Sequence, residues 1–247
     1  MRIAVGAPVA DRAEILPRWF ECLRAQTIQP DDYIFIHSGD RDETYRILVE
    51  NGARVTRTAL PYYSRNERNL DPADPHRARH LARLRNQGRR EFLLTDADVF
   101  FSLDTDILLE DPTVIERLLA LLEDGWDTAS PLLYLHPLGE RSECYNAGWW
   151  KTRDPAGHGN FDFGRAWERA TKNQVLSYRS PLKIDIPMAA VMMKRHALAM
   201  CRYQAHELGE DMGFAQQLEK HGMRCAWATD ILVRHVMDPK ALEVKVA

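Results

Sequence analysis

The sequence has no apolar run long enough to cross a membrane, and its opening residues lack the pattern of a secretory signal peptide. Its 247 residues include only four cysteines, which are scattered along the chain without a Cys-x-x-Cys pair. Zinc ribbons, redox motifs and a disulfide framework are therefore poorly supported. We expect a cytoplasmic protein with no membrane span.

A strong charge of either sign is also lacking, because 33 Lys and Arg residues face 36 Asp and Glu residues and leave a net charge of -3. This balance gives no overall attraction to nucleic acid or to anionic membranes. Arginines do gather between residues 77 and 90, but apolar residues among them indicate a helix with a solvated face. A nucleic-acid acceptor is therefore the less favoured interpretation.

What the chain does contain is 45% hydrophobic residues, enough for a full core, arranged as alternating strand-like and helix-like segments. We expect early strands near 3–5, 33–36 and 54–58, with helices near 13–26 and 43–50 between them. This order is typical of an α/β fold with a mostly parallel central sheet flanked by helices. The later segments predict helices at 75–88, from 112, at 195–202 and at 210–221, and strands near 92–101, 128–135, 186–193 and 224–228. No repeat or linker divides the chain, so we expect one domain over residues 1–247.

Two carboxylates one residue apart, Asp96 and Asp98, mark the segment from Phe92 to Phe101. We interpret the segment as a buried strand that delivers both charges to one place, because residues i and i+2 of a strand share a face. Burying unpaired carboxylates is costly, so this arrangement favours a bound cation or a strong donor. The alternative is a strand that ends in a solvated turn.

Two later features also carry candidate chemistry. Glu210 and Asp211 stand where a helix is expected to begin, which favours negative charge, so helix capping is the simpler explanation of the pair. His235 lies among apolar residues, where a hydrogen-bonded structural histidine is more common than a metal ligand.

Taken together and in order, these motifs resemble those of the GT-A fold glycosyltransferases, especially the inverting family 2 enzymes, over most of the chain. Segment 6–9 resembles the family's first nucleotide-binding loop, and segment 36–40 its acidic stretch, although His37 and Ser38 replace aspartates there. Segment 82–86 resembles the family's Ala-Arg-Asn helix. The resemblance implies a single GT-A (Rossmann-like) domain, with a nucleotide-sugar-binding part over about 1–101 and an acceptor and catalytic part over about 102–247.

The resemblance also implies roles for individual residues. Asp98 would ligate a divalent cation with His235, and Asp96 would hold the ribose or a metal-bound water, with Mn²⁺ or Mg²⁺ as the cofactor. Asp211 would be the base that takes the acceptor's proton, and Glu210 would orient it or the acceptor. The residues expected to bind the UDP- or GDP-sugar donor are Pro8, Val9, Arg12, His37, Ser38, Asp40, Arg85, Asp96 and Ala97. Direct displacement on such a donor would invert the anomeric centre.

Adjacent tryptophans, Trp149 and Trp150, are candidates for a wall against the acceptor or the donor sugar, since aromatic faces pack on sugar rings. A pair of core tryptophans is the alternative. The acceptor itself stays open between a glycan, a protein side chain, a small molecule and a modified base.

Three other functions remain open. A haloacid-dehalogenase-like phosphohydrolase would use Asp96 as its nucleophile, although its motif usually opens the chain. A nucleotidyltransferase would share the sheet and the metal, but it would need a glycine-rich basic loop after the first strand. A non-catalytic nucleotide-sugar or glycan-binding protein would need no Asp211.

Overall fold

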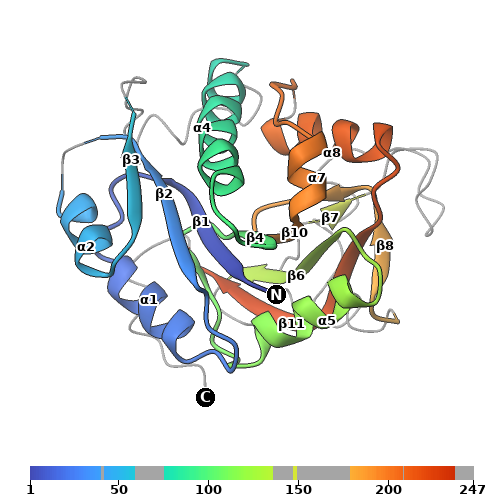
Figure 1. Cartoon of the computed structure of the whole chain (residues 1–247), viewed down its shortest axis with the longest axis horizontal. Coiled ribbons are helices and arrows are strands. Elements are labelled where there is room, and N and C mark those ends of the chain that lie inside the picture. Colours follow the sequence, from blue (N-terminus) through green and yellow to red (C-terminus); the bar gives the residue numbers. More distant parts are fainter. Residues whose placement is uncertain (40–41, 59–74, 136–146, 149–178, 208, 237–247) are drawn as a thin grey trace.

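Strands and helices alternate over the first 102 residues or so of the computed structural model, which describes residues 1–39, 42–58, 75–135, 147–148, 179–207 and 209–236 (Figure 1). The helices are α1 (Leu16–Arg24), α2 (Thr44–Glu50), α4 (Pro75–Leu93), α5 (Val114–Glu123), α7 (Arg195–Met200) and α8 (Glu210–Lys220). The strands are β1 (Ile3–Val9), β2 (Asp32–His37), β3 (Arg54–Arg57), β4 (Val99–Ser102), β5 (Ile107–Leu108), β6 (Thr128–Leu135), β7 (Ala147–Gly148), β8 (Leu182–Ile184), β9 (Ile186–Pro187), β10 (Val191–Lys194) and β11 (Cys225–His235).

Within the described ranges the main sheet has nine strands in the order β3-β2-β1-β4-β10-β6-β11-β5, with β8 also paired to β11. The neighbours β3, β2, β1 and β4 are parallel, and so are β6 and β11. β10 runs antiparallel between β4 and β6, and β5 and β8 run antiparallel to β11. The predicted α/β fold with a mostly parallel central sheet flanked by helices is confirmed.

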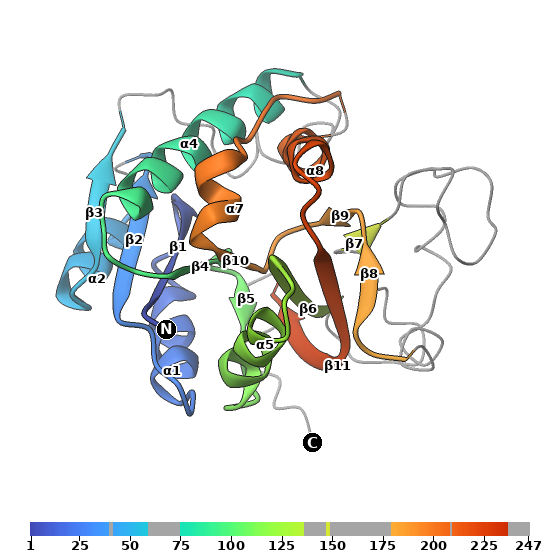
Figure 2. The ribbon, with the colours of Figure 1, turned by 45° about the vertical axis from the view of Figure 1, so that its right-hand side comes forward.

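Helices cover both faces of this sheet. On one face α1, α2 and α5 bury their apolar sides, with Trp19, Leu48 and Leu118 in the same core cluster. On the other face α4, α7 and α8 contribute a second cluster that includes Phe92, Leu198 and Phe214. Figures 1 and 2 show these two layers of helices on opposite sides of the strands. Burial on both faces explains why the central strands are continuous apolar runs.

Strand β1 is positioned by a close backbone contact. Gly6 pairs with Ile34 of β2, and a Cβ atom at Gly6 would lie 1.8 Å from the carbonyl oxygen of Ile34. A side chain at this position would therefore overlap the backbone of β2, so the close pairing of the two strands requires glycine here.

Two predicted boundaries around α4 are wrong. The helix does not end at Gly88 but continues to Leu93, and the following strand begins only at Val99. Phe92 extends the buried side of the helix marked by Ala78, Ala82 and Gly88, because residues spaced by about one turn share a helix face. Its ring packs against Phe100 at a centroid distance of 5.2 Å. The first part of the apolar run from Phe92 is therefore helix.

Among the described residues, no helix combines the length and the apolar character needed to span a bilayer.

Candidate active site

Several chain segments meet at one edge of the main sheet, where its parallel strands have their carboxyl ends. β1 ends at Val9, β4 at Ser102 and β11 at His235. In the sheet, β2 and β3 lie on one side of β1, and β4 lies on its other side. Open α/β sheets bind ligands at the carboxyl edge beside such a switch in strand order. The residues that follow these strand ends are the candidates for the site.

Asp104 and Asp106 follow β4 directly and lie at this edge. The short strand β5 turns back after them and pairs with the end of β11, so that Ile107 faces His235. The backbone N–H of Val236 donates to the carbonyl oxygen of Asp106 at 2.7 Å. As a result, the His235 Nε2 atom lies 3.5 Å from Oδ1 of Asp106, with about 15% of each side chain exposed.

Arg12, in the loop after β1, reaches the same carboxylate. Its Nη2 donates to Oδ2 of Asp106 at 2.7 Å. Burial works to raise the pKa of Asp106, but the hydrogen bond with His235 and the positive charge of Arg12 prevail and lower that pKa to about 2. Asp106 is therefore ionised at neutral pH.

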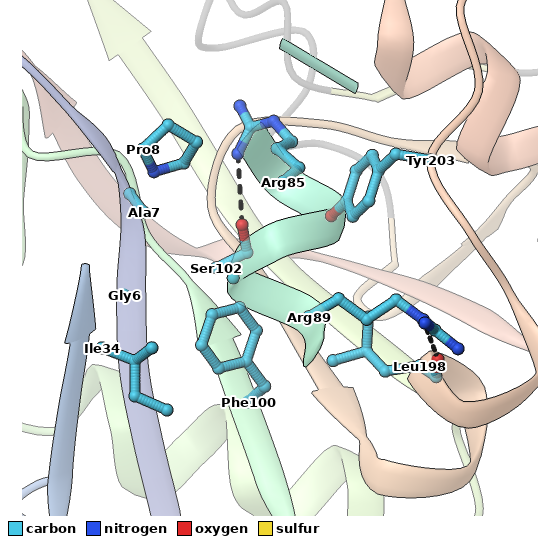
Figure 3. A pocket seen from close by; sticks show the side chains of 11 residues that line it. Gly6, Ala7, Pro8, Ile34, Arg85, Arg89, Phe100, Ser102, Leu198 and Tyr203 are labelled. Carbon is cyan, nitrogen blue, oxygen red and sulfur yellow. Dashed lines mark hydrogen bonds between the residues drawn. The ribbon is translucent and has the colours of Figure 1, made fainter. Parts of the chain in front are cut away.

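Arg85 projects from α4 and joins Asp104 to the start of α8. Its Nη1 and Nη2 atoms each donate to a different oxygen of Asp104 at 3.3 Å, and its Nε donates to Glu210 at 3.0 Å. Nη1 also donates to the hydroxyl of Ser102 at 3.3 Å (Figure 3). Despite burial, the three nearby carboxylates keep the pKa of Arg85 well above its usual value.

Glu210 and Asp211 occupy the first turn of α8, where exposed N–H groups and the helix dipole favour negative charge. Glu210 is buried and bound by Arg85, whereas Asp211 is half-buried. Burial raises the pKa of Asp211 to about 7, the negative charge of Glu210 adds to the effect, and Arg85 acts against it. A carboxylate with such a pKa can take and release a proton near neutral pH.

Tyr203 closes the inner side of this cluster. Its ring stacks on Phe214 of α8 at a centroid distance of 4.2 Å, and the Arg85 guanidinium lies 5.8 Å from the same ring. Its hydroxyl is hydrogen-bonded to Ser102, and burial raises the pKa of Tyr203 well above 10. Figure 3 shows Tyr203, Arg85 and Ser102 around a small hollow beside β1, which is too small for a nucleotide. These contacts support the site from beneath.

The prediction that places Asp96, Ala97 and Asp98 in this site is contradicted. They precede β4 and lie at its amino end, where the backbone N–H of Arg2 donates to Oδ2 of Asp98 at 2.8 Å. Asp96 is 73% exposed and paired with Arg2, and Ala97 is buried. The length of β4 separates the Asp96–Asp98 pair from Asp104 by about 20 Å at the usual rise per residue. Asp96 and Asp98 therefore cannot share a ligand with His235 or Asp211.

The same finding affects two other interpretations. From this position Asp98 cannot ligate the metal at the carboxyl edge, and Asp96 cannot contact the ribose there. The phosphohydrolase alternative, in which Asp96 is the nucleophile, loses its support for the same reason. The sequence contained a signal for the correct pair: Asp104-Thr105-Asp106 is a second Asp-x-Asp, and it follows the apolar run 99–103. Sequence reasoning missed Asp104 and Asp106 because it took the first motif as the end of the strand.

The other predicted donor residues are distributed around this edge. Pro8 and Val9 end β1, but Val9 is 3% exposed and belongs to the core. His37 ends β2, with its ring 5.7 Å from that of Tyr45, and the backbone N–H of Ser38 donates to the carbonyl oxygen of Val9. Asp40, Trp149 and Trp150 lie outside the described residues.

The side chains at this edge fit a divalent cation that binds together with a nucleotide. Asp106 and His235 offer an oxygen and a nitrogen on adjoining segments, and Asp104 lies two residues from Asp106. In the described part of the chain, no three His, Cys, Asp or Glu side chains converge into a complete metal cluster. Mg²⁺ is commonly held by one or two carboxylates plus the phosphates of a substrate, which matches this partial set of ligands.

Sequence comparison finds no related protein: no family model matches the chain, and no curated protein matches it. Solved structures do match. The chain is similar to glucosyl-3-phosphoglycerate synthase from Mycobacterium tuberculosis in complex with phosphoglyceric acid, with 15% identity and a TM-score of 0.50, over 94% of this chain and 68% of that one. It is also similar to the mannosyltransferase PcManGT from Pyrobaculum calidifontis in complex with GDP-Man and Mn²⁺. That match has 13% identity and a TM-score of 0.56, over 96% of this chain and 57% of that one.

A mycobacterial protein of 16% identity matches with a TM-score of 0.48, over 95% of this chain. The chain spans 64% of the length of that protein. At these identities the likeness concerns the fold. The chain has the GT-A-like fold of these glycosyltransferases.

Proposed function

We propose that the protein is a metal-dependent glycosyltransferase that moves a sugar from a UDP- or GDP-sugar to an acceptor hydroxyl with inversion. The observation that carries this proposal is that Asp104, Asp106 and His235 lie at the carboxyl edge of the sheet, where Arg85 joins Asp104 to Glu210, the neighbour of Asp211. The fold shared with a mannosyltransferase solved with GDP-Man and Mn²⁺ supports the choice of donor.

Each group has a separate task in this proposal. Asp106 and His235 hold Mn²⁺ or Mg²⁺, which stabilises the negative charge that develops on the diphosphate leaving group. Arg85 holds Asp104 and Glu210 in place, so we assign it a positioning role, whereas the family resemblance implied a contact with the nucleotide or its phosphates. Asp211 takes the proton of the acceptor hydroxyl as that oxygen bonds to the anomeric carbon and the bond to the diphosphate breaks.

The two Asp-x-Asp pairs provide a matched test of this proposal. Asp106→Asn should lower Mn²⁺-dependent release of nucleoside diphosphate from a UDP- or GDP-sugar by at least about 100-fold, since it removes a charged ligand. Asp98→Asn, at the opposite edge of the sheet, should retain the wild-type rate. Loss of activity in Asp98→Asn with activity retained in Asp106→Asn would refute the site, and inactivity of the wild-type chain on every nucleotide sugar would refute the function.

A further inference from the structure

Arg12 binds one oxygen of Asp106, the carboxylate whose other oxygen faces His235 in the proposed metal site. Its Nη2 lies 2.7 Å from Oδ2, while Oδ1 lies 3.5 Å from Nε2 of His235. Arg12 is 21% exposed and Asp106 is 16% exposed, so solvent screens their attraction only in part. A divalent cation bound by Asp106 and His235 would therefore lie close to the positive charge of Arg12, with one carboxylate shared between them.

The backbone around Arg12 is anchored, although its side chain is long. The N–H of Arg12 donates to the hydroxyl of Thr44 at 2.7 Å, and the N–H of Ala13 donates to Asp42 at 3.1 Å. Asp11 adopts a φ of 48°, a left-handed conformation that aspartate tolerates better than most residues, and it turns the loop at this point. These bonds hold the backbone of the loop at the start of α2. A change of partner by the Arg12 guanidinium would therefore need only rotation of the side chain.

The position of Arg12 suggests its second partner. The residue lies in the loop after β1, beside the switch in strand order between β1 and β4, where a nucleotide's diphosphate is expected in a sheet of this kind. Guanidinium groups bind phosphate through paired N–H donors, and charge-assisted hydrogen bonds of this type are strong. A diphosphate offers Arg12 more negative charge than the single carboxylate of Asp106.

We propose that Arg12 exchanges Asp106 for the diphosphate of the bound nucleotide, so that metal ion and nucleotide each bind more tightly in the presence of the other. This inference rests on the proposed function, since it takes a nucleoside diphosphate as the ligand. The coupling is reciprocal, because each ligand must change the affinity of the other by the same factor. Arg12 thereby makes Asp106 available chiefly when a donor is present.

The first experiment measures Mn²⁺ affinity without nucleotide, by electron paramagnetic resonance of the free ion. Arg12→Gln should bind Mn²⁺ on the order of tenfold more tightly than wild type, because the competing charge is gone. Arg12→Lys retains a positive charge and should show a smaller gain. Arg46→Gln is the matched control, since Arg46 is exposed and forms its ion pairs with Glu43 and Glu50, close to it in sequence.

The second experiment measures the affinity for UDP and GDP by calorimetry, without metal. Arg12→Gln should bind the preferred nucleotide on the order of tenfold more weakly, and wild type should gain affinity when Mn²⁺ is added. Thermal unfolding of each variant verifies that it is folded, and Arg12→Lys replaces Arg12→Gln if the latter is not.

The outcomes separate the exchange from the function on which it rests. Nucleotide binding with an unchanged or weaker Mn²⁺ affinity in Arg12→Gln would overturn the exchange alone. A gain in Mn²⁺ affinity without binding of either nucleotide in wild type would overturn both the exchange and the proposed function.

Discussion

Asp211 lies beside Glu210 in the first turn of α8, and its protonation depends on that placement. Burial makes the largest contribution to its raised pKa, followed by the charge of Glu210, while Arg85 limits the rise. A carboxyl group with a pKa of about 7 is a stronger base than an ordinary aspartate and is still ionised in useful amounts at neutral pH.

The pH dependence of catalysis follows from this value. Only ionised Asp211 can accept a proton, so kcat/KM should rise about tenfold per pH unit below a pH of about 7 and level off above it. Asp211→Asn should lower kcat by about 10² to 10⁴-fold and remove this limb of the profile. Steady-state kinetics between pH 5 and 9 measure both effects, and a flat wild-type profile would contradict the role of Asp211 as the base.

The same group has an effect on stability with a defined sign. Because the folded-state pKa of Asp211 is above the unfolded value of 3.8, the folded protein binds this proton more tightly. Its contribution to stability is complete below pH 3.8 and is lost as pH rises through about 7. Urea unfolding should therefore show that Asp211→Asn gains stability relative to wild type between pH 5 and pH 8.

At the scale of single elements, β4 explains which part of the site could be predicted. The apolar run 99–103 and its burial are evident from the sequence, and an Asp-x-Asp precedes it and another follows it. Which pair reaches the ligand depends on strand direction and on pairing with β1, and neither property is encoded in the local pattern. Glu210 and Asp211 begin a helix as the sequence predicts, and His235 ends β11, while their proposed roles stay predictions.

Much of the fold was predictable for the same reason. The segments 3–9, 32–37 and 128–135 are strands close to their predicted positions, because continuous apolar runs between turn residues identify buried strands. The segment 231–235 continues the strand predicted at 224–228, across an irregularity between Ala228 and Leu232. Arg85 was predicted to contact phosphate, and its buried contacts with Asp104 and Glu210 were not predictable, since they join elements distant in sequence.

Helix α8 offers a test of how its first turn is held in place. Gly213 packs against the backbone at Gln204, and an added Cβ would lie 2.1 Å from the carbonyl oxygen of Gln204. Gly213→Ala should improve helix propensity by about 1 kcal/mol, but the overlap should outweigh this gain and destabilise the protein by about 1–3 kcal/mol net.

The matched control lies one turn along the same helix. Gln216 is exposed, so Gln216→Ala should change the free energy of unfolding by less than about 0.5 kcal/mol. Denaturant unfolding of both variants makes the comparison. Equal or greater stability of Gly213→Ala relative to wild type would show that α8 can shift away from Gln204.

At the scale of the whole molecule, the two edges of the sheet carry different groups. The amino edge joins Arg2 to Asp96, Asp98 and Asp32 through contacts that contribute to structure. The carboxyl edge carries Asp104, Asp106 and Asp211, three carboxyl groups whose pKa values are shifted. Ligand binding should therefore depend on the carboxyl edge alone.

Ligand binding should also stabilise the entire fold. With Mn²⁺ present, the preferred nucleoside diphosphate at 100 times its Kd should stabilise the folded state by about 2.7 kcal/mol and raise Tm by about 5–10 °C. Differential scanning fluorimetry with UDP, GDP and the monophosphates UMP and GMP measures the shift. Equal stabilisation by monophosphates and diphosphates would contradict a site built around a diphosphate.

The pairing of β5 with the end of β11 has a consequence for biosynthesis. Val236 and His235 fix the backbone and side chain of Asp106, yet they are made long after the first four parallel strands have left the ribosome. A nascent chain that has formed β1 to β4 therefore carries Asp104 and Asp106 without the segment that completes their surroundings. Under the proposed function, donor binding should begin only after β11 has joined the sheet, so a chain that stops before β11 should lack a complete binding site.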